Sequence, residues 1–267
     1  MRYIASALIR SAEGEPGGLA KPDYAERDAA HWRRLHALFE RSGFTDRDVL
    51  GNFAAYVRRR DLVRFLAHYE LFKLIVDLPG CVVEAGVFRG ASFFTWAKLM
   101  ETFCPGDRSR KVYGFDHFAG LQGFTEEDGR FDLATDKTPG GYASSLENIE
   151  ELVALHNDDG LIPGVERCRV INGDIKTSLP GFLADNPGLK ISLLHLDMDI
   201  YEPTKVALEL LYDRVLTGGV VVLDEYGLVP WEGETRAVDG FLASRGLSPV
   251  IRKFPFTATP HGYFIKA

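Results

Sequence analysis

From residue 80 onward, short apolar runs alternate with longer segments in which apolar positions recur every three or four residues. Continuous apolar runs are typical of buried parallel strands, and the periodic segments are typical of helices. The predicted strands are residues 81–85, 111–115, 168–172, 191–196 and 219–223. The predicted helices are residues 91–103, 142–157, 177–185, 203–215 and 233–245. Repeated strand–helix units of this kind indicate an α/β fold built on a parallel sheet.

The end of the chain departs from this alternation. Residues 249–256 and 263–266 are predicted to be two further strands, joined by the short turn at residues 257–262. Strands that are joined by so short a connection are antiparallel. We therefore expect a seven-stranded sheet with six parallel strands and the last strand reversed.

The first 79 residues contain no strand candidate. Residues 1–23 carry several glycines and prolines without periodicity, which predicts a flexible N-terminal segment. Residues 24–79 have helical periodicity and are predicted to form a helical cap on the catalytic domain of residues 80–267. Within that domain, residues 118–142 are rich in Gly, Asp and Thr. They are predicted to be a mobile lid or, alternatively, a surface insertion without such a role.

Composition narrows the classes of protein and partner. The 267 residues, 46% hydrophobic and 26% charged, suit one α/β domain with an elaboration. The net charge of −7, with no basic run longer than residues 58–60, argues against nucleic-acid binding. Three cysteines are too few for a disulfide framework; they are Cys81, Cys104 and Cys168. Without a long signal-peptide core or a bilayer-spanning stretch, we expect a cytoplasmic protein with no membrane partner. Apolar faces on several sides of the cap favour a homo-oligomer.

Acidic residues follow the fourth and fifth predicted strands. Asp197 and Asp199 come after residues 191–196, and Asp224 and Glu225 come after residues 219–223. Parallel strands end at one edge of a sheet, where α/β folds bind ligands. Four carboxylates there repel one another unless a cation lies among them, and Mg²⁺ is the natural candidate. His195 points to the same sheet face as Asp197 and could act as a general base, although packed strand histidines are commoner.

The loop after the first strand predicts a nucleoside ligand. It has two glycines, but not the G-x-G-x-x-G spacing of dinucleotide-binding proteins. S-adenosylmethionine, which has no pyrophosphate, fits this loop, although a turn that needs glycine only for its geometry would look the same. Acids after the second and third strands could bind the ribose and the adenine, or could be only helix N-caps. The candidate cofactor contacts are Glu84, Gly86, Phe88, Arg89, Gly90, Ser92, Asp116 and Asp174.

Together these motifs resemble the macrocin O-methyltransferase family of class I S-adenosylmethionine-dependent enzymes. The resemblance covers about residues 68–240 and rests on residues 69–73, 83–90, 114–120, 196–205, 224–226 and 230–235. It implies a Rossmann-like class I methyltransferase fold and Mg²⁺-dependent methylation of a sugar hydroxyl on a natural-product glycoside or nucleotide-linked deoxysugar. The implied metal ligands are Asp197, Asp224 and Glu225, where some members have Asp in place of Glu225. Glu84, Gly86 and Asp116 fall in the implied cofactor pocket.

The expected reaction is an in-line displacement at the methyl group. Two neighbouring acceptor hydroxyls would chelate Mg²⁺, and Asp197, Asp199 or solvent would take the proton of the attacking one. A catechol-type acceptor would chelate the ion equally well. An NAD-dependent oxidoreductase would share the sheet and Asp116, but would leave the acids unexplained. A binding protein with a decayed site would have little reason to keep four mutually repelling carboxylates.

Overall fold

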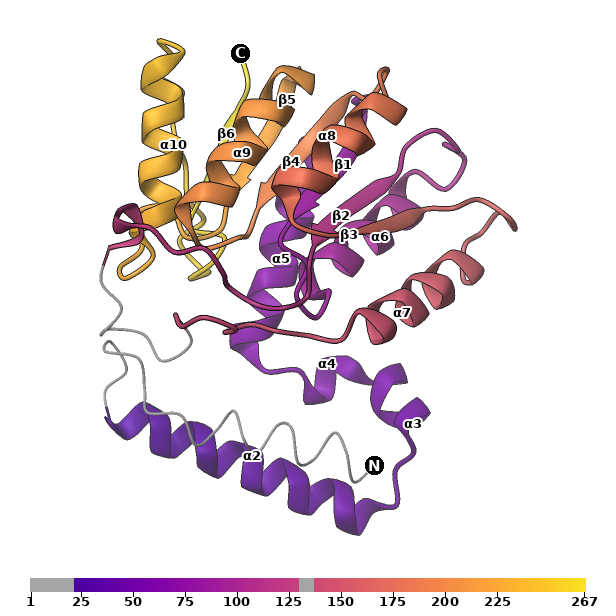
Figure 1. The fold of residues 1–267 in the computed structure, drawn as a ribbon. Coiled ribbons are helices and arrows are strands. Elements are labelled where there is room, and N and C mark those ends of the chain that lie inside the picture. The colour runs from indigo at the N-terminus through magenta and orange to yellow at the C-terminus, as the bar shows by residue number, and fades with distance from the viewer. Residues whose placement is uncertain (1–21, 130–136) are drawn as a thin grey trace. The chain divides into compact units, whose positions relative to one another are not determined.

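The computed structural model describes residues 22–129 and 137–267, and contacts within the chain divide it into two units (Figure 1). One unit comprises Met1–Arg59 and Arg130–Thr138, and the other comprises Arg60–Gly129 and Pro139–Ala267. The predicted flexible segment at residues 1–23 lies outside the described residues except for its last two positions. Residues 130–136 of the predicted lid also lie outside them.

The described part of the first unit is helical. It contains α2 (Pro22–Ser42), α3 (Asp46–Gly51) and α4 (Phe53–Tyr56). Thr45 begins α3 with a capping box, in which its side chain accepts from the Asp48 N–H and the Asp48 side chain accepts from the Thr45 N–H. The helical pattern predicted from the sequence is therefore present here, whereas the role of these helices as a cap stays a prediction.

A single sheet forms the centre of the second unit. Its strands are β1 (Cys81–Ala85), β2 (Val112–Asp116), β3 (Cys168–Asn172), β4 (Ile191–Leu196), β5 (Val215–Leu223) and β6 (Gly262–Ile265). Their order is β3-β2-β1-β4-β5-β6, with β1 to β5 parallel and β6 antiparallel to β5. The strand order reverses direction between β1 and β4, so that the carboxyl ends of these strands border a crevice where α/β folds bind ligands.

The prediction of seven strands is wrong for the described residues, which contain six. Residues 249–256 do not form a strand and touch β6 through one isolated bridge, between Arg252 and Tyr263. The physical reason lies in Pro249 and Pro255, which have no N–H to donate to a ladder. Instead, β6 pairs directly with the exposed edge of β5 over four residues. The reversed last strand is thus confirmed, but not the hairpin.

Helices cover both faces of the sheet (Figure 1). One core contains residues of α8 (Ile175–Asp185), α9 (Tyr201–Leu211) and α10 (Glu232–Ser244). The core on the other face contains residues of α5 (Arg59–Lys73), α6 (Ala91–Phe103) and α7 (Leu146–Asp158). Side chains along β1 alternate between the two faces of the sheet and so contribute to both cores. Val83 and Ala85 face the first core, and Val82 faces the second. Two short 3₁₀ helices, η1 (Glu126–Asp128) and η2 (Tyr212–Arg214), complete the elements.

The described part of the predicted lid is anchored at its base. The Leu121 N–H donates to the Gly141 carbonyl (2.7 Å), and the Gly140 N–H donates to the Leu121 carbonyl (2.9 Å). Asp128 is fully buried and accepts from the Tyr201 N–H at 2.7 Å. These contacts fix residues 121–128 against the sheet unit, and movement of this segment stays a prediction.

None of the helices in the described ranges is long and apolar enough to cross a membrane.

Candidate active site

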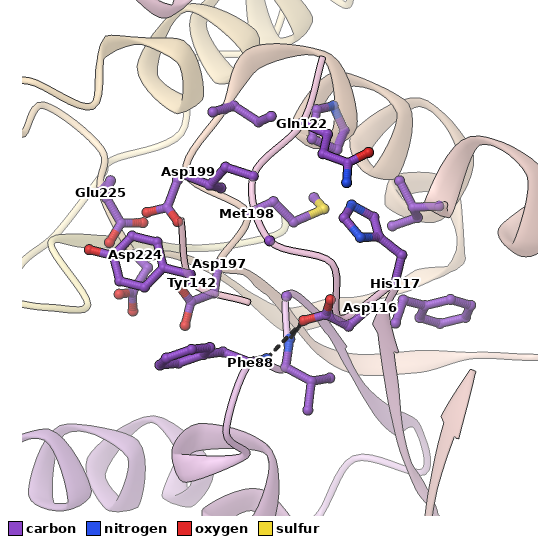
Figure 2. A pocket seen from close by; sticks show the side chains of 18 of the residues that line it. Phe88, Asp116, His117, Gln122, Tyr142, Asp197, Met198, Asp199, Asp224 and Glu225 are labelled. Carbon is purple, nitrogen blue, oxygen red and sulfur yellow. Dashed lines mark hydrogen bonds between the residues drawn. The ribbon is translucent and has the colours of Figure 1, made fainter. Parts of the chain in front are cut away.

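A cavity of about 830 Å³ lies at the carboxyl ends of the parallel strands. Each of these strands places a cavity-lining residue at or just beyond its end. These residues are Gly86 after β1, Asp116 on β2, Asp174 after β3, Asp197 after β4 and Asp224 after β5. Figure 2 shows Asp116 and His117 on one side of the cavity, Asp199, Asp224 and Glu225 on the other, and Met198 between them. The size suits a small-molecule ligand.

The glycine loop after β1 needs both of its glycines for geometric reasons. Gly86 has a φ of 94°, and a Cβ there would lie 1.7 Å from the carbonyl oxygen of Asp197. Gly90 has a φ of 83°, and a Cβ there would lie 2.4 Å from the ring of Phe94. Gly86 lines the cavity, whereas Gly90 fixes the start of α6 without lining it.

Asp116 joins two loops at the β2 end of the cavity. Its Oδ2 accepts from the N–H groups of Val87 (2.9 Å) and Phe88 (2.8 Å), and its Oδ1 accepts from the Phe118 N–H (2.7 Å). Each carboxylate oxygen has about two acceptor positions, so Oδ1 keeps capacity for a ligand while Oδ2 is fully used. Asp174 is the N-cap of α8, accepting from the Lys176 N–H at 2.9 Å, and also lines the cavity.

The remaining candidate cofactor residues divide into two groups. Phe88 and Ser92 line the cavity. Glu84 is fully buried behind it and accepts from the Ser92 hydroxyl at 2.9 Å. Arg89 is exposed, with its guanidinium 4.9 Å from the centre of the Phe88 ring. Glu84 is therefore placed to orient other side chains, and Arg89 does not line the cavity.

Arg64 of α5 supplies a cation among the acids, and no sequence pattern predicted this role for it. Its Nη2 donates to Asp197 Oδ2 at 2.8 Å and to Asp224 Oδ1 at 3.1 Å. Its Nη1 lies 3.1 Å from Asp224 Oδ2 and donates to the Thr259 hydroxyl at 2.7 Å. The acids raise the pKa of Arg64 despite burial, which acts the other way, so the guanidinium stays charged.

His195 is fully buried and links two acids. Its Nδ1 lies 3.2 Å from Glu84 Oε2, and its Nε2 lies 3.2 Å from Asp224 Oδ1. Burial by itself lowers the pKa of His195, but hydrogen bonds to Asp224 and Glu84 outweigh that effect and raise it to about 10. The ring is therefore a buried cation that orients Asp224. It does not line the cavity, and this geometry does not suit a base that touches the acceptor.

Charges around the site divide the acids into two classes. Burial would raise the pKa of Asp224, but Arg64 and His195 hold it below its usual range. Burial and the charge of Asp224 raise the pKa of Asp197 to about 7, even with Arg64 acting in the opposite direction. Burial, followed by the charges of Asp224 and Asp199, raises the pKa of Glu225 well above its usual value. Without a further cation, the carboxyl groups of Asp197 and Glu225 therefore favour their protonated forms more than free carboxyl groups do.

The family follows from comparison with known proteins. Residues 73–260 match the family model "Macrocin-O-methyltransferase (TylF)".

The chain belongs to the macrocin O-methyltransferase family.

Curated relatives agree with this assignment. An 8-demethyl-8-(2,3-dimethoxy-alpha-L-rhamnosyl)-tetracenomycin-C 4'-O-methyltransferase of Streptomyces olivaceus is 31% identical over 153 residues, which are 57% of this chain and 54% of that protein. A demethyldecarbamoylnovobiocin O-methyltransferase of Streptomyces niveus is 30% identical over 156 residues, which are 58% of this chain and 55% of that protein. The chain thus matches about half the length of these curated relatives.

Solved structures confirm the class I methyltransferase fold. The calicheamicin methyltransferase CalS11 is similar with a TM-score of 0.81 and 26% identity, over 92% of this chain and 93% of that one. A second structure is the apo form of CalS11, described as a TDP-rhamnose 3'-O-methyltransferase. It is similar with a TM-score of 0.74 and 27% identity, over 92% of this chain and 95% of that one.

Side chains in this macrocin O-methyltransferase family member fit a divalent cation. Glu225 is 7% exposed, and its Oε2 has no hydrogen-bond partner among the residues that the structure describes. Ligand atoms of Asp197, Asp199 and Glu225 lie within 4.8 Å of one another, and those of His195, Asp197 and Asp224 form a second such group. An all-oxygen set with one unsatisfied buried oxygen suits Mg²⁺. Asp197, Asp224 and Glu225 all line the cavity, and their role as metal ligands stays a prediction.

A second cavity of about 570 Å³ adjoins the first and shares Arg64, Ala91 and Thr259 with it. Most of its wall surface is apolar, and Thr95 and Thr257 are among the lining residues. His68 also lines this cavity, is 1% exposed, and has no described hydrogen-bond partner at either ring nitrogen. Burial and the nearby charge of Arg64 lower the pKa of His68, so its ring is neutral. A neutral imidazole offers a ligand one donor and one acceptor.

Proposed function

We propose that the chain transfers the methyl group of S-adenosylmethionine to a hydroxyl group of a sugar, on a natural-product glycoside or a nucleotide-linked deoxysugar, and that the transfer requires Mg²⁺. One observation carries the proposal. In this family member, a single cavity has the glycine loop after β1 at one end and a cluster of acids at the other. The names of the relatives that act on sugar-bearing compounds support the choice of acceptor.

The cofactor would bind at the β1 and β2 end of the cavity. Asp116 would accept hydrogen bonds from the ribose hydroxyls, and Gly86 would let the ligand approach the backbone. Asp174 lines the cavity where an adenine amino group could donate to it. Ser92 and Phe88 complete the wall, while Glu84 orients Ser92 from behind.

Mg²⁺, when bound at the acid cluster, would supply charge stabilisation and would lower the pKa of an acceptor hydroxyl. The chain's own groups would hold and move the proton. Asp197 or Asp199, which line the same wall, would accept the proton of the attacking hydroxyl. His195 and Arg64 act as positioning residues, because they fix Asp224 and Asp197.

The acceptor would extend into the second cavity. This cavity shares Arg64 and Ala91 with the first, and its hydroxyl and imidazole groups would suit a polyhydroxylated ring. Replacing His68 by Phe is expected to raise the KM for the acceptor while leaving the affinity for S-adenosylhomocysteine unchanged. An unchanged KM would place the acceptor elsewhere.

The deciding experiment is calorimetric titration of S-adenosylhomocysteine into the full chain, with NAD⁺ as a parallel control. Micromolar binding of S-adenosylhomocysteine alone supports methyl transfer, whereas binding of NAD⁺ alone would favour the oxidoreductase alternative. Methylation of TDP-deoxyhexoses and of catechol, each with MgCl₂ or EDTA, then separates the two acceptor classes and tests the metal. Activity that persists in EDTA would remove Mg²⁺ from the proposal.

The domain roles and the assembly also remain proposals. We expect the helices before β1 to select the acceptor, and we expect the chain to form a homo-oligomer. Size-exclusion chromatography with light scattering would test the oligomeric state.

A further inference from the structure

Three aromatic side chains form part of the wall of the first cavity. Phe88, Tyr142 and Trp231 all line it, and they come from three different loops. The rings of Phe88 and Tyr142 meet edge to face, with their centres 5.5 Å apart and their planes at 86°. The centres of the Tyr142 and Trp231 rings are 6.0 Å apart. The three rings therefore form a continuous row, which we call the aromatic wall.

The aromatic wall connects the two ends of the cavity. At the β2 end, the Phe88 N–H donates to Asp116 Oδ2 at 2.8 Å. At the acid end, the Trp231 N–H donates to the Leu228 carbonyl and the Leu228 N–H donates to the Glu225 carbonyl, each at 2.8 Å. The wall thus begins where the ribose is proposed to bind and ends beside the acids where the acceptor is proposed to bind.

The backbone adopts an unfavourable conformation at two of the three rings. The φ angle is 50° at Phe88 and 58° at Tyr142, a region that bulky residues seldom adopt. The Ser144 hydroxyl donates to the Phe88 carbonyl at 2.6 Å and so holds the two strained segments together. Tyr142 is 39% exposed, and Figure 2 shows its ring on the acid side of the cavity. Backbone strain costs stability and is concentrated at functional sites, which indicates that these rings are placed for a ligand and not only for packing.

The position of the aromatic wall determines which part of the cofactor would meet it. In S-adenosylmethionine the sulfur is bonded to the 5′ carbon of the ribose and carries the methyl group. With the ribose at Asp116 and the acceptor hydroxyl at the acids, the sulfur would lie between them, beside the aromatic wall. This sulfur is a cation, and the faces of aromatic rings attract cations. The guanidinium of Arg89 already lies 4.9 Å from the centre of the Phe88 ring, so we assign Phe88 the role of orienting Tyr142.

We propose that the rings of Tyr142 and Trp231 bind the sulfonium of S-adenosylmethionine by cation–π interaction, and that they thereby distinguish the cofactor from its demethylated product. This inference rests on the proposed function and adds to it a means of telling the two forms of the cofactor apart. During transfer, the acceptor oxygen bonds to the methyl carbon, and the hydroxyl proton passes to a carboxylate of the cavity. The carbon–sulfur bond breaks with its electron pair left on sulfur. The sulfur is then a neutral thioether, so the cation–π attraction ends when the product forms.

Packing of the acceptor against the same rings is the competing explanation. The C–H groups of a sugar ring would also contact aromatic faces, and an acceptor at the acids would lie near the Trp231 end of the aromatic wall. The two explanations differ in what cofactor binding would show. Rings that serve only the acceptor would have no effect on the affinity for either form of the cofactor.

Calorimetric titrations of S-adenosylmethionine and of S-adenosylhomocysteine into the full chain, in EDTA, test the inference without an acceptor. The quantity compared is the ratio of the two dissociation constants. Tyr142→Leu and Trp231→Leu should each shift this ratio about threefold or more against S-adenosylmethionine. Tyr142→Phe keeps the aromatic face and should keep the wild-type ratio. The matched control is Phe103→Leu, because Phe103 is 46% exposed and is not among the residues that line either cavity; both constants should stay unchanged.

Each other result overturns the inference in a recognisable way. If Tyr142→Leu weakens both ligands equally, the ring contacts an uncharged part of the cofactor, and if it changes neither constant, the aromatic wall serves the acceptor. In both cases the proposed function stands. A shift in Tyr142→Phe as large as that in Tyr142→Leu would assign the discrimination to the hydroxyl group and not to the ring face. Trp231 is only 8% exposed and its replacement could impair folding, so the exposed Tyr142 decides the test. A wild-type chain that binds neither ligand would refute the proposed function itself.

Discussion

Replacing Arg64 by Met tests whether this guanidinium is the resident counter-charge of the acid cluster. Methionine keeps an unbranched apolar stem of similar length but removes the charge and every hydrogen bond. The lost contacts are those to Asp197 at 2.8 Å, to Asp224 at 3.1 Å, and to the Thr259 hydroxyl at 2.7 Å. Two carboxylates would then face each other with only His195 to neutralise them.

The expected loss of stability follows from the burial of these groups. Removing one partner of a buried ion pair typically destabilises a protein by about 3–5 kcal/mol. The Arg64 side chain keeps 29% exposure, so solvent screens part of the effect, and we expect about 2–3 kcal/mol. For a domain of this size, each kcal/mol shifts the Tm by about 2–4 °C, which gives a fall of roughly 5–10 °C.

The pH dependence supplies a second check. The folded-state pKa of Asp197, about 7, lies above its ordinary value of 3.8. Its contribution to stability is therefore full below pH 3.8 and is lost as the pH rises through about 7. Without Arg64 this pKa should rise further, so that repulsion within the cluster is relieved by protonation at pH 5.5 but not at pH 8.5. Thermal unfolding in EDTA should show a larger loss at pH 8.5.

The matched control is Arg245→Met, which removes an exposed ion pair with Asp213 on the surface. Such pairs contribute at most about 1 kcal/mol, so its Tm should change little at either pH. A variant of Arg64 that melts within about 2 °C of the wild type at pH 8.5 would refute the counter-charge role. A loss that is greater at pH 5.5 than at pH 8.5 would refute the electrostatic reasoning.

Three further substitutions test other parts of the site. Gly86→Ala should abolish S-adenosylhomocysteine binding in calorimetry, because the new methyl group would lie 1.7 Å from the Asp197 carbonyl oxygen. The control Gly246→Ala, with positive φ but nothing within 4 Å, should lose only about 1–2 kcal/mol of stability. Asp116→Asn should weaken S-adenosylhomocysteine binding about tenfold or more, because its amide nitrogen cannot accept from a ribose hydroxyl; equal affinity would move the ribose away from β2. His195→Gln should flatten the stability–pH profile, since the raised pKa stabilises the wild type below pH 6.5 and this contribution is lost as the pH rises through about 10. A wild-type Tm that does not fall between pH 7 and 10 would contradict the charged ring.

The parallel sheet could be predicted because its strands are fully buried. Every residue of β4 is buried, so the apolar run in the sequence marks both of its ends. The predicted helix at residues 91–103 coincides with α6, whose apolar positions recur with helical spacing. The proximity of Asp197 to Asp224 follows from the predicted topology, because each residue comes directly after one of two neighbouring parallel strands, β4 and β5.

Arg64 could not be predicted in the same way, because 133 residues separate it from Asp197. Helical spacing places Arg64 and His68 on the same face of α5 as the buried Leu71. A basic residue that continues an apolar stripe is a signal of a buried partner. The sequence does not say which acid that partner is, since helix α5 lies outside the repeating strand–helix units. The strand predicted at residues 249–256 is absent for a different reason. The composition there is strand-like, but its two prolines cannot donate hydrogen bonds to a neighbouring strand.

The division of charge within the site separates folding from metal binding. Glu84, His195, Asp224, Arg64 and Asp197 form a continuous series of buried pairs in which the chain supplies its own cations. A structural metal site lacks such internal cations, and its protein unfolds when the metal is removed. Here the paired acids would hold β4 and β5 in place whether or not an ion is bound, and only the cavity-facing carboxylates would respond to it. Asp197 belongs to both sets, because it pairs with Arg64 and also lines the cavity, so it would connect a bound ion to the paired series.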